Sequence, residues 1–388
     1  MHINDNIIIK IYGTNNGIIS DIDLQQGVAL ENVDITKQDV YMKKGENGQF
    51  FTPRNVIEMC VRMLNPKEEE KMIDTACGSS GFPVHTIFHV WRQLAKDRGL
   101  DISEFFSLDQ KPYEFTEYVK ENIFGIDFDE KAVRVARTLN LIAGDGHTNV
   151  LHLNTLDYTQ WTETAKQEEW LSTYFEGFDR LKKLRKDNRS FRDFKFDILM
   201  ANPPFAGDIK ESRILCLYEL AKNAKGKQQS KVGRDILFIE RNIDFLKPGG
   251  RMAIVLPQGR FNNSSDKYIR EYIANHCRIL AVVGLHGNVF KPHTGTKTSV
   301  LFVQKWDDEL CPKKEDYPIF FATMQEPGKD NSGNVINVKD TETGEKKVDS
   351  HGHMFVKHDL YNHEGLTQDG IAEAFIEFAK KEGLSFFR

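Results

Sequence analysis

Short apolar runs alternate with amphipathic stretches from Met72 onward, and this alternation is the strongest structural signal in the chain. Seven runs rich in β-branched residues predict buried strands: MIDTACG, IFGIDF, NVLHLN, FDILMANPP, RMAIVLP, ILAVVGLH and TSVLFVQ. Helical periodicity follows four positions: Phe82, Glu130, Asp235 and Ser264. Strands that alternate with helices predict an α/β fold with a doubly wound, mostly parallel sheet.

The pattern divides the chain into three regions. Residues 1–48 are polar and Gly/Asn-rich without a clear helical period, which indicates a lead-in or a shortened helical domain. Residues 49–310 carry the alternation and form the main domain, with 87–121 and 156–195 as insertions. Residues 311–388 form a C-terminal extension of solvated loops before an amphipathic helix around IAEAFIEFAKK.

Composition narrows the class of protein. Hydrophobic residues make up 40% of 388 residues, enough for a sizeable core. No run approaches the roughly 18 apolar residues of a membrane span, and the N-terminus lacks a signal-peptide layout, so we expect a cytoplasmic protein without a membrane partner. The five cysteines lack metal-ligand spacing, so no metal site is expected. A net charge of -5 means that any contact with nucleic acid is local or shared with a partner.

Small residues follow the first predicted strand, where Gly78 and Gly81 allow the backbone to approach a ligand closely. Such a turn also occurs in α/β domains that bind nothing. The second strand ends at Asp127, at a separation that suits a carboxylate facing ribose hydroxyls. The alternative role, capping the next helix, suits Asp129 better.

Three further residues, at two places in the sequence, are typical of turns and helix ends. Asn154 ends the third strand, where its side chain either contacts a cofactor's adenine or forms a turn. Thr52 and Pro53 precede a helical pattern, and they suit the N-cap and the first helical position.

The fourth strand runs into Asn202-Pro203-Pro204-Phe205, the most informative sequence in the chain. Two prolines make the turn rigid and leave the Pro203 carbonyl free to accept a hydrogen bond. Together with the Asn202 oxygen, it can bind both hydrogens of an amino group and turn the nitrogen lone pair toward an electrophile. Phe205 offers a flat face for an extruded base, although a core position is the alternative.

These motifs resemble the N6-adenine DNA methyltransferases, and most closely the modification subunit of type I restriction-modification systems. The resemblance runs from about Gln49 to Lys305. GQFFTPR looks like the family's N-terminal cofactor motif, DTACGSSGF resembles its cofactor loop and ANPPF its catalytic motif. LKPGGRMAIVLPQGRF and VVGLHGNVFKPHTGTKTSVLFVQK resemble its later blocks.

The resemblance implies a Rossmann-like methyltransferase fold with seven strands, the last of them antiparallel, and residues 49–310 as its catalytic domain. It implies adenine held by Asn202, Pro203, Pro204 and Phe205, with Phe290 as a second stacking aromatic. The S-adenosylmethionine site that it implies comprises Phe51, Thr52, Pro53, Asp74, Ala76, Gly78, Ser79, Gly81, Phe82, Asp127, Phe128 and Asn154.

Three positions depart from the family pattern. Thr75 stands where the family usually has proline, Ser80 where it has glycine, and Asn154 where many members have an acidic residue. An asparagine still accepts a hydrogen bond through its oxygen. Most members also carry an N-terminal helical domain and a longer C-terminal region, so we expect an atypical or truncated member.

The same resemblance implies three partners: double-stranded DNA, a DNA-sequence specificity subunit and a restriction subunit. The basic stretches Arg180–Lys195 and Lys222–Arg234 flank the catalytic turn in sequence. They form either a phosphate track beside the site or solvated faces.

Two other functions compete with DNA adenine methylation. An Asn-Pro-Pro-aromatic turn also serves amine methyltransferases that act on guanine in RNA or on glutamine in protein, but these favour tyrosine where this chain has Phe205. The other alternative is a non-catalytic scaffold that keeps the methyltransferase fold.

Overall fold

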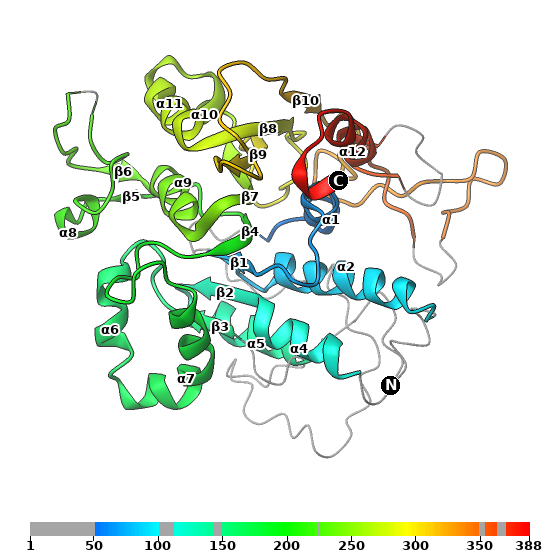
Figure 1. The fold of residues 1–388 in the computed structure, drawn as a ribbon. Helices are drawn as coiled ribbons and strands as arrows, with labels where there is room; N and C mark the ends of the chain where they lie inside the picture. Colours follow the sequence, from blue (N-terminus) through cyan, green and yellow to red (C-terminus); the bar gives the residue numbers. More distant parts are fainter. Residues whose placement is uncertain (1–50, 101–111, 143–148, 224, 349–353, 363–369) are drawn as a thin grey trace, which may run out of the picture.

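One eight-stranded sheet runs through the described part of the chain, in the order β10-β8-β9-β7-β4-β1-β2-β3 (Figure 1). The computed structural model describes residues 51–388 except 101–111, 143–148, 224, 349–353 and 363–369. The predicted lead-in, residues 1–48, and the Gln49-Phe50 pair of GQFFTPR therefore lie outside the described residues. Among the helices described, none combines the length and apolar character needed to cross a membrane.

All seven predicted runs are strands, and the prediction of a mostly parallel sheet is confirmed. They are β1 (Met72–Asp74), β2 (Ile123–Asp127), β3 (Asn149–His152), β4 (Phe196–Ala201), β7 (Leu246–Pro257), β8 (Cys277–Gly284) and β9 (Thr298–Lys305). β9 runs antiparallel to both neighbours, β7 and β8, as the resemblance implied for the last strand. An eighth strand, β10 (Phe320–Thr323), pairs in parallel with β8 at the sheet edge. It lies in the region expected to be loops.

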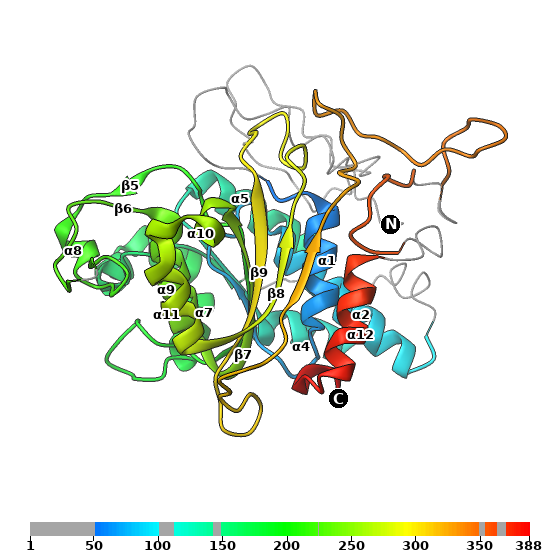
Figure 2. The same cartoon turned by 90° about the horizontal axis from the view of Figure 1, so that it is seen from above.

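Helices cover both faces of the sheet (Figure 2). One face is covered by α1 (Arg54–Leu64), α2 (Gly81–Asp97), α4 (Tyr113–Asn122) and α12 (Ile371–Lys381). The other is covered by α5 (Glu130–Ile142), α7 (Glu168–Lys183), α9 (Arg234–Phe245) and α11 (Lys267–His276). The shorter elements are η3 (Tyr158–Gln160), α6 (Trp161–Thr164), β5 (Asp208–Ile209), α8 (Ser212–Leu215), β6 (Val232–Gly233), α10 (Gly259–Asn262), η4 (Ser264–Asp266) and η5 (Ser385–Phe387).

Two details of the predicted helices are wrong. The first insertion was expected from residue 87, but α2 continues to Asp97 because its apolar face stays buried through Leu94 and Ala95. The prediction that Thr52 caps the next helix also fails: α1 begins at Arg54, Pro53 occupies the capping position, and no side chain caps it.

β1 lies between β2 and β4, and this is where the strand order reverses. The chain leaves β1 for β2 and β3 on one side and returns to β4 on the other. In open α/β sheets, ligands bind at such a point, outside the carboxyl ends of the strands. The loops after Asp74 and Ala201 therefore meet at the expected position of a site.

The C-terminal region packs onto the same sheet. Phe375 of α12 is fully buried, stacks on Phe302 of β9 at 6.1 Å and meets Phe320 of β10 edge-on at 5.6 Å, both between ring centroids. α12 also lies against α1. This helix therefore belongs to the hydrophobic core on that face of the sheet.

We predict that Phe375→Ala lowers the free energy of unfolding by about 3–5 kcal/mol, because it removes a large buried ring and leaves a cavity. The matched control is Phe321→Ala, since Phe321 is 70% exposed on the neighbouring edge strand and should change stability by less than about 0.5 kcal/mol. Urea unfolding followed by circular dichroism measures both. Equal midpoints for the two variants would contradict a core role for α12.

Candidate functional site

The loop after β1 is shaped by buried polar groups. Asp74 is almost fully buried, and its Oδ1 accepts a hydrogen bond from the Ala76 amide at 3.0 Å. Burial raises the pKa of Asp74 well above its ordinary value, and the charge of Asp127 adds to the rise. Gly78 has φ +50°, and a Cβ there would meet nothing within 4 Å, so open space lies beside the loop. At Gly81, in contrast, a Cβ would stand 2.7 Å from the Ile57 side chain.

Asp127 ties this loop to the end of β2. Its Oδ2 accepts from the Gly78 amide at 2.8 Å and its Oδ1 from the Asp129 amide at 2.9 Å. Burial raises the pKa of Asp127, and the two backbone hydrogen bonds oppose the rise. Asp129 caps α5 by accepting from the amides of Lys131 and Ala132, which confirms the capping role expected of Asp129, while the ribose contact of Asp127 stays a prediction. Phe128, between them, is 70% exposed.

The two departures within the cofactor motif lie in buried hydrogen bonds. Ser80 adopts φ +70°, and its hydroxyl donates to Asn140 Oδ1 of α5 at 3.0 Å. The Thr75 hydroxyl donates to Asn242 Oδ1 of α9 at 2.7 Å, while the Thr75 carbonyl accepts from the Thr155 hydroxyl at 2.6 Å. Both side chains therefore fasten the loop to neighbouring elements. No pattern in the sequence pointed to Asn140 or Asn242 as their partners.

Asn154 forms the turn that was the alternative to cofactor contact. Its Oδ1 accepts from the Leu156 amide at 3.1 Å, and its carbonyl accepts from the Trp161 indole at 2.8 Å. The side chain is partly exposed. Its amide nitrogen is the group that can still face a ligand, so contact with a cofactor stays a prediction.

The Asn-Pro-Pro-Phe turn directly follows β4. Asn202 Nδ2 donates to the Thr52 hydroxyl at 3.0 Å, which gives Thr52 a partner 150 positions away in place of the expected helix cap. Because the amide nitrogen makes this bond, Oδ1 is the atom of Asn202 that can accept from a substrate amino group. Pro203 is buried, and Pro204 and Phe205 are half-buried.

Phe205 and Phe290 lie together beside this turn. Their rings meet edge-on, with centroids 6.1 Å apart and an interplanar angle of 88°. Phe290 is 3% exposed, so its ring supports Phe205 from the core side in this conformation. Phe205 is the more accessible of the two rings.

Most of the predicted site residues therefore gather at the carboxyl ends of β1, β2, β3 and β4. Phe51 and Pro53 precede α1 on the Thr52 side, and both are partly exposed. Ala76 and Ser79 are partly exposed in the loop after β1, while Phe82 is buried in α2. Across the described residues, no group of three or more His, Cys, Asp or Glu side chains is placed to hold a metal ion.

The fold and this site together define the class of protein: a doubly wound α/β domain of the methyltransferase type, with an Asn-Pro-Pro-Phe turn beside a small-residue loop. The chain belongs to the N-6 DNA methylase family, whose model matches residues 37–363. The family inferred from the motifs is thus confirmed.

Known relatives agree with this assignment. The chain is 27% identical over 265 residues to the type I restriction enzyme EcoEI methylase subunit of Escherichia coli, covering 67% of this chain and 43% of that protein. It is 24% identical over 285 residues to the EcoKI methylase subunit of E. coli K12, covering 73% and 44%. A solved modification subunit assigned to a type I restriction enzyme of Vibrio vulnificus matches with TM-score 0.50 and 22% identity, covering 80% and 52%. The chain spans about half the length of the curated relatives it matches.

Ser80 provides a test of the loop's construction. Ser80→Ala removes the donor to Asn140 Oδ1, which is buried, so we expect a loss of about 1–3 kcal/mol in the free energy of unfolding. Ser80→Gly loses the same bond but relieves the left-handed backbone conformation by about 1–2 kcal/mol, so it should be the less damaging change. Denaturant unfolding of both variants measures this. The reverse order would argue against backbone strain at residue 80.

Proposed function

We propose that this chain transfers a methyl group from S-adenosylmethionine to the exocyclic N6 of adenine in DNA, as the modification component of a type I restriction-modification system. The observation that carries the proposal is the hydrogen bond from Asn202 Nδ2 to Thr52 Oγ1. It fixes the amide at the end of β4, beside the loop after β1, with its oxygen as the remaining acceptor.

The chain's own residues fit the cofactor. Asp127 joins the loop after β1 to the end of β2, and its carboxylate suits ribose hydroxyls at the second strand. Open space beside Gly78 lets a ligand approach the backbone there. When bound, S-adenosylmethionine supplies a methyl group on an electrophilic sulfonium. Asp127 and the loop after β1 then hold and orient it.

The substrate amine needs orientation more than a tuned base. Asn202 Oδ1 and the Pro203 carbonyl accept its two hydrogens, which turns the nitrogen lone pair toward the methyl group. Pro203 and Pro204 have no N–H, so neither offers a backbone donor at the turn. Phe205 stacks on the extruded base, a contact worth about 1–3 kcal/mol, and the buried Phe290 supports it edge-on.

Two substitutions separate chemistry from cofactor binding. Asn202→Ala should reduce methyl transfer at least about 100-fold through lost orientation while leaving cofactor affinity unchanged. Asp127→Ala should weaken cofactor binding by about 10–100-fold, because it removes a charged acceptor. Calorimetric titration of S-adenosylmethionine and tritiated methyl transfer to duplex DNA, RNA and protein measure the two effects.

Asn188→Ala is the matched control, since Asn188 is exposed away from the site. Methyl transfer that survives Asn202→Ala would refute the role of the turn. Preference for RNA or protein would favour the other amine methyltransferases. A folded wild-type chain that binds no cofactor would favour the scaffold.

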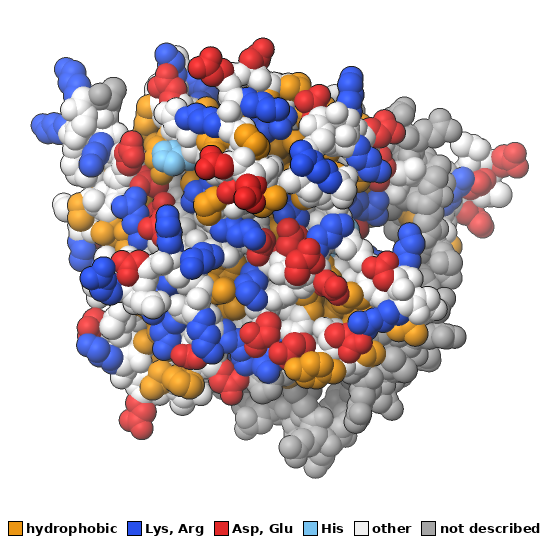
Figure 3. Space-filling model, viewed as in Figure 1, with side chains coloured by type: hydrophobic (Ala, Val, Ile, Leu, Met, Phe, Trp, Pro, Cys, Tyr) orange, Lys and Arg blue, Asp and Glu red, His pale blue; other side chains and the backbone are white. Residues whose placement is uncertain are grey.

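DNA contact is proposed at one projection of the surface. Residues 206–233, here called the lobe, begin directly after Phe205, contain β5, α8 and β6, and return to α9 (Figure 1). Asn223 shapes the tip of the lobe, because its Oδ1 accepts from the backbone amides of Lys225 and Lys227. Lys222, Lys225 and Lys227 are exposed there, and no ion pair joins them to a described residue. Figure 3 shows basic side chains on this projection at the upper left, whereas charges of both signs mix elsewhere on that face.

The other basic stretch, Arg180–Lys195, is largely paired within the chain. Its ion pairs are Arg180 with Glu121 and Glu176, Lys182 and Lys183 with Asp179, Arg189 with Asp187, and Arg192 with Glu240 and Asp244. A side chain already neutralised by a neighbour gains less from a phosphate. The lobe is therefore the favoured DNA contact.

Replacing Lys222, Lys225 and Lys227 together by Ala should weaken DNA binding and flatten its salt dependence. Each lost phosphate contact changes the slope of log affinity against log salt by about 0.9. The control replaces the exposed Lys313, Lys314 and Lys346, with the same change of charge outside the lobe. Fluorescence anisotropy on a labelled duplex across salt concentrations measures both. Identical salt slopes in the two triple variants would refute the assignment of the lobe as a DNA contact.

We propose that this chain acts together with the two partners that the family implies, a specificity subunit and a restriction subunit. Recognition of the target DNA sequence would then depend on these partners.

A further inference from the structure

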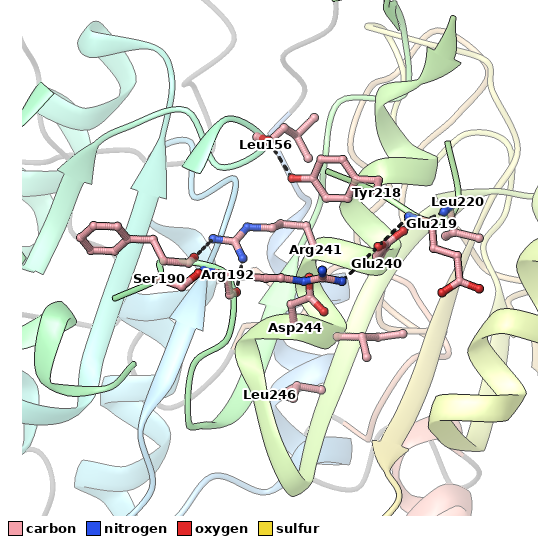
Figure 4. A network of polar contacts seen from close by, with 12 residues as sticks. Leu156, Ser190, Arg192, Tyr218, Glu219, Leu220, Glu240, Arg241, Asp244 and Leu246 are labelled. Carbon is pink, nitrogen blue, oxygen red and sulfur yellow. Dashed lines mark hydrogen bonds and ion pairs between the residues drawn. The ribbon is translucent and has the colours of Figure 1, made fainter. Parts of the chain in front are cut away.

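Three consecutive residues of α9 are polar and fully buried: Glu240, Arg241 and Asn242, each 0% exposed. Burying such groups costs free energy unless they are hydrogen-bonded or paired. Each of the three reaches a different loop, and Figure 4 shows the first two with their partners. α9 thus connects segments far apart in the sequence.

Arg241 and Asn242 reach the cofactor side of the site. Arg241 Nε donates to the Thr155 carbonyl at 3.0 Å, next to Asn154, and Nη2 donates to the Phe191 carbonyl at 2.8 Å. Its guanidinium lies over the rings of Tyr158 and Phe245, with 4.5 and 4.3 Å from Cζ to the ring centroids. Asn242 accepts the Thr75 hydroxyl from the loop after β1.

Glu240 reaches the opposite side, into the lobe. Its Oε1 accepts from the Glu219 amide at 2.9 Å and its Oε2 from the Leu220 amide at 2.8 Å. These two amides lie just before the tip that carries Lys222. The Glu240 carboxylate therefore holds the loop segment that leads to the proposed DNA contact.

Other contacts also hold this part of the lobe: the Tyr218 hydroxyl donates to the Leu156 carbonyl at 2.7 Å, and Tyr218, Leu220 and Ala221 are buried in the core. β5 and β6 pair over two residues each, at the root. A pocket of about 660 Å³ opens between Glu219, Leu220 and α11, where Tyr272 and Glu271 line its other side. The pocket separates α11 from the Glu219–Leu220 segment on this side, and the two hydrogen bonds to Glu240 fix the direction of the segment's backbone amides.

We propose that Glu240 is a positioning residue for DNA binding, which holds in place the segment of the lobe that leads to its lysine tip. The inference rests on the proposed function and assigns substrate positioning to a residue that touches neither cofactor nor base. Loss of the Glu240 carboxylate weakens DNA binding and raises the KM for DNA. The same loss leaves cofactor affinity unchanged, because Arg241 and Asn242, and not Glu240, reach the loops on the cofactor side.

The surroundings of Glu240 make its hydrogen bonds to the lobe sensitive to pH. Burial raises the pKa of Glu240 to about 7; the Glu219 and Leu220 amides oppose the rise, Asp244 adds to it and Arg192 opposes it. Arg192 Nη2 lies 3.7 Å from Oε1. The other titratable groups that face Glu240 are the hydroxyls of Tyr218, in the lobe, and Tyr272, on α11.

The direction of the pH dependence follows from the two hydrogen bonds that Glu240 accepts. Above the pKa, the carboxylate accepts from both amides. Below it, the protonated oxygen is a donor and can no longer accept fully, so one amide loses its partner. DNA affinity should therefore fall as the pH drops through about 7, while cofactor affinity should not.

The test is Glu240→Gln in the full chain, with DNA binding followed by anisotropy between pH 6 and 8. Gln keeps the volume, but its nitrogen faces one of the amides, so affinity at pH 8 should fall on the order of 10-fold and the pH dependence between 6 and 8 should disappear. S-adenosylmethionine titration should match the wild type. Glu271→Gln, an exposed α11 residue beside the same pocket, is the control with an equal change of charge.

Wild-type DNA affinity and pH profile in Glu240→Gln would overturn the proposal, as would equal losses of DNA and cofactor binding. If the variant does not fold, hydrogen exchange of the wild-type segment 216–223 provides the answer. Amide protection, corrected for intrinsic rates, should fall between pH 8 and 6, and constant protection would refute it. DNA binding is read without turnover, so a chain that binds DNA in this pH-dependent way but transfers no methyl group would refute the proposed function alone.

Discussion

The parallel pairing of β1 with β4 is the constraint on which the site depends. Met72 lies opposite Ile198 and Ile73 opposite Leu199, so the two strands end side by side. Their next residues form the loop after β1 and the Asn-Pro-Pro-Phe turn. Because the chain diverges at this point toward β2 on one side and β7 on the other, no strand fills the space beyond. The loop after β1 and the Asn-Pro-Pro-Phe turn meet there because of this strand order.

The sequence predicts the strands well because a strand buried on both faces reads as an uninterrupted apolar run. β4, FDILMA, is buried at all six positions. β10 escapes prediction because FFAT spans four residues at an edge, with alternating partial and full exposure and polar loops around it. Its place in the sheet depends on β8 and on Phe375 of α12, contacts that no local pattern encodes.

Local rules also misassign polar side chains with distant partners. Thr52 has the residue type of a helix cap, yet its hydroxyl accepts from Asn202 across 150 positions. The sequence of α9, RDILFIERNIDF, has helical periodicity, but nothing in it shows that its polar ERN segment is buried. In the fold, the lobe and the loops after β1 and β3 cover that segment. The motifs thus predict which loops come together at the carboxyl ends of the strands, whereas the residues that hold these loops together are found only in the structure.

The buried polar residues of α9 are explained by the backbone groups that they satisfy. Replacing buried charges with apolar groups of similar volume is often neutral or stabilising, so stability alone does not explain Glu240 and Arg241. Apolar side chains, however, cannot satisfy the amides of Glu219 and Leu220 or the carbonyl of Thr155. These groups belong to loops that lack helix or sheet partners, and leaving such groups buried without partners is costly. α9 thus supplies the donors and acceptors that the irregular backbone of these loops requires.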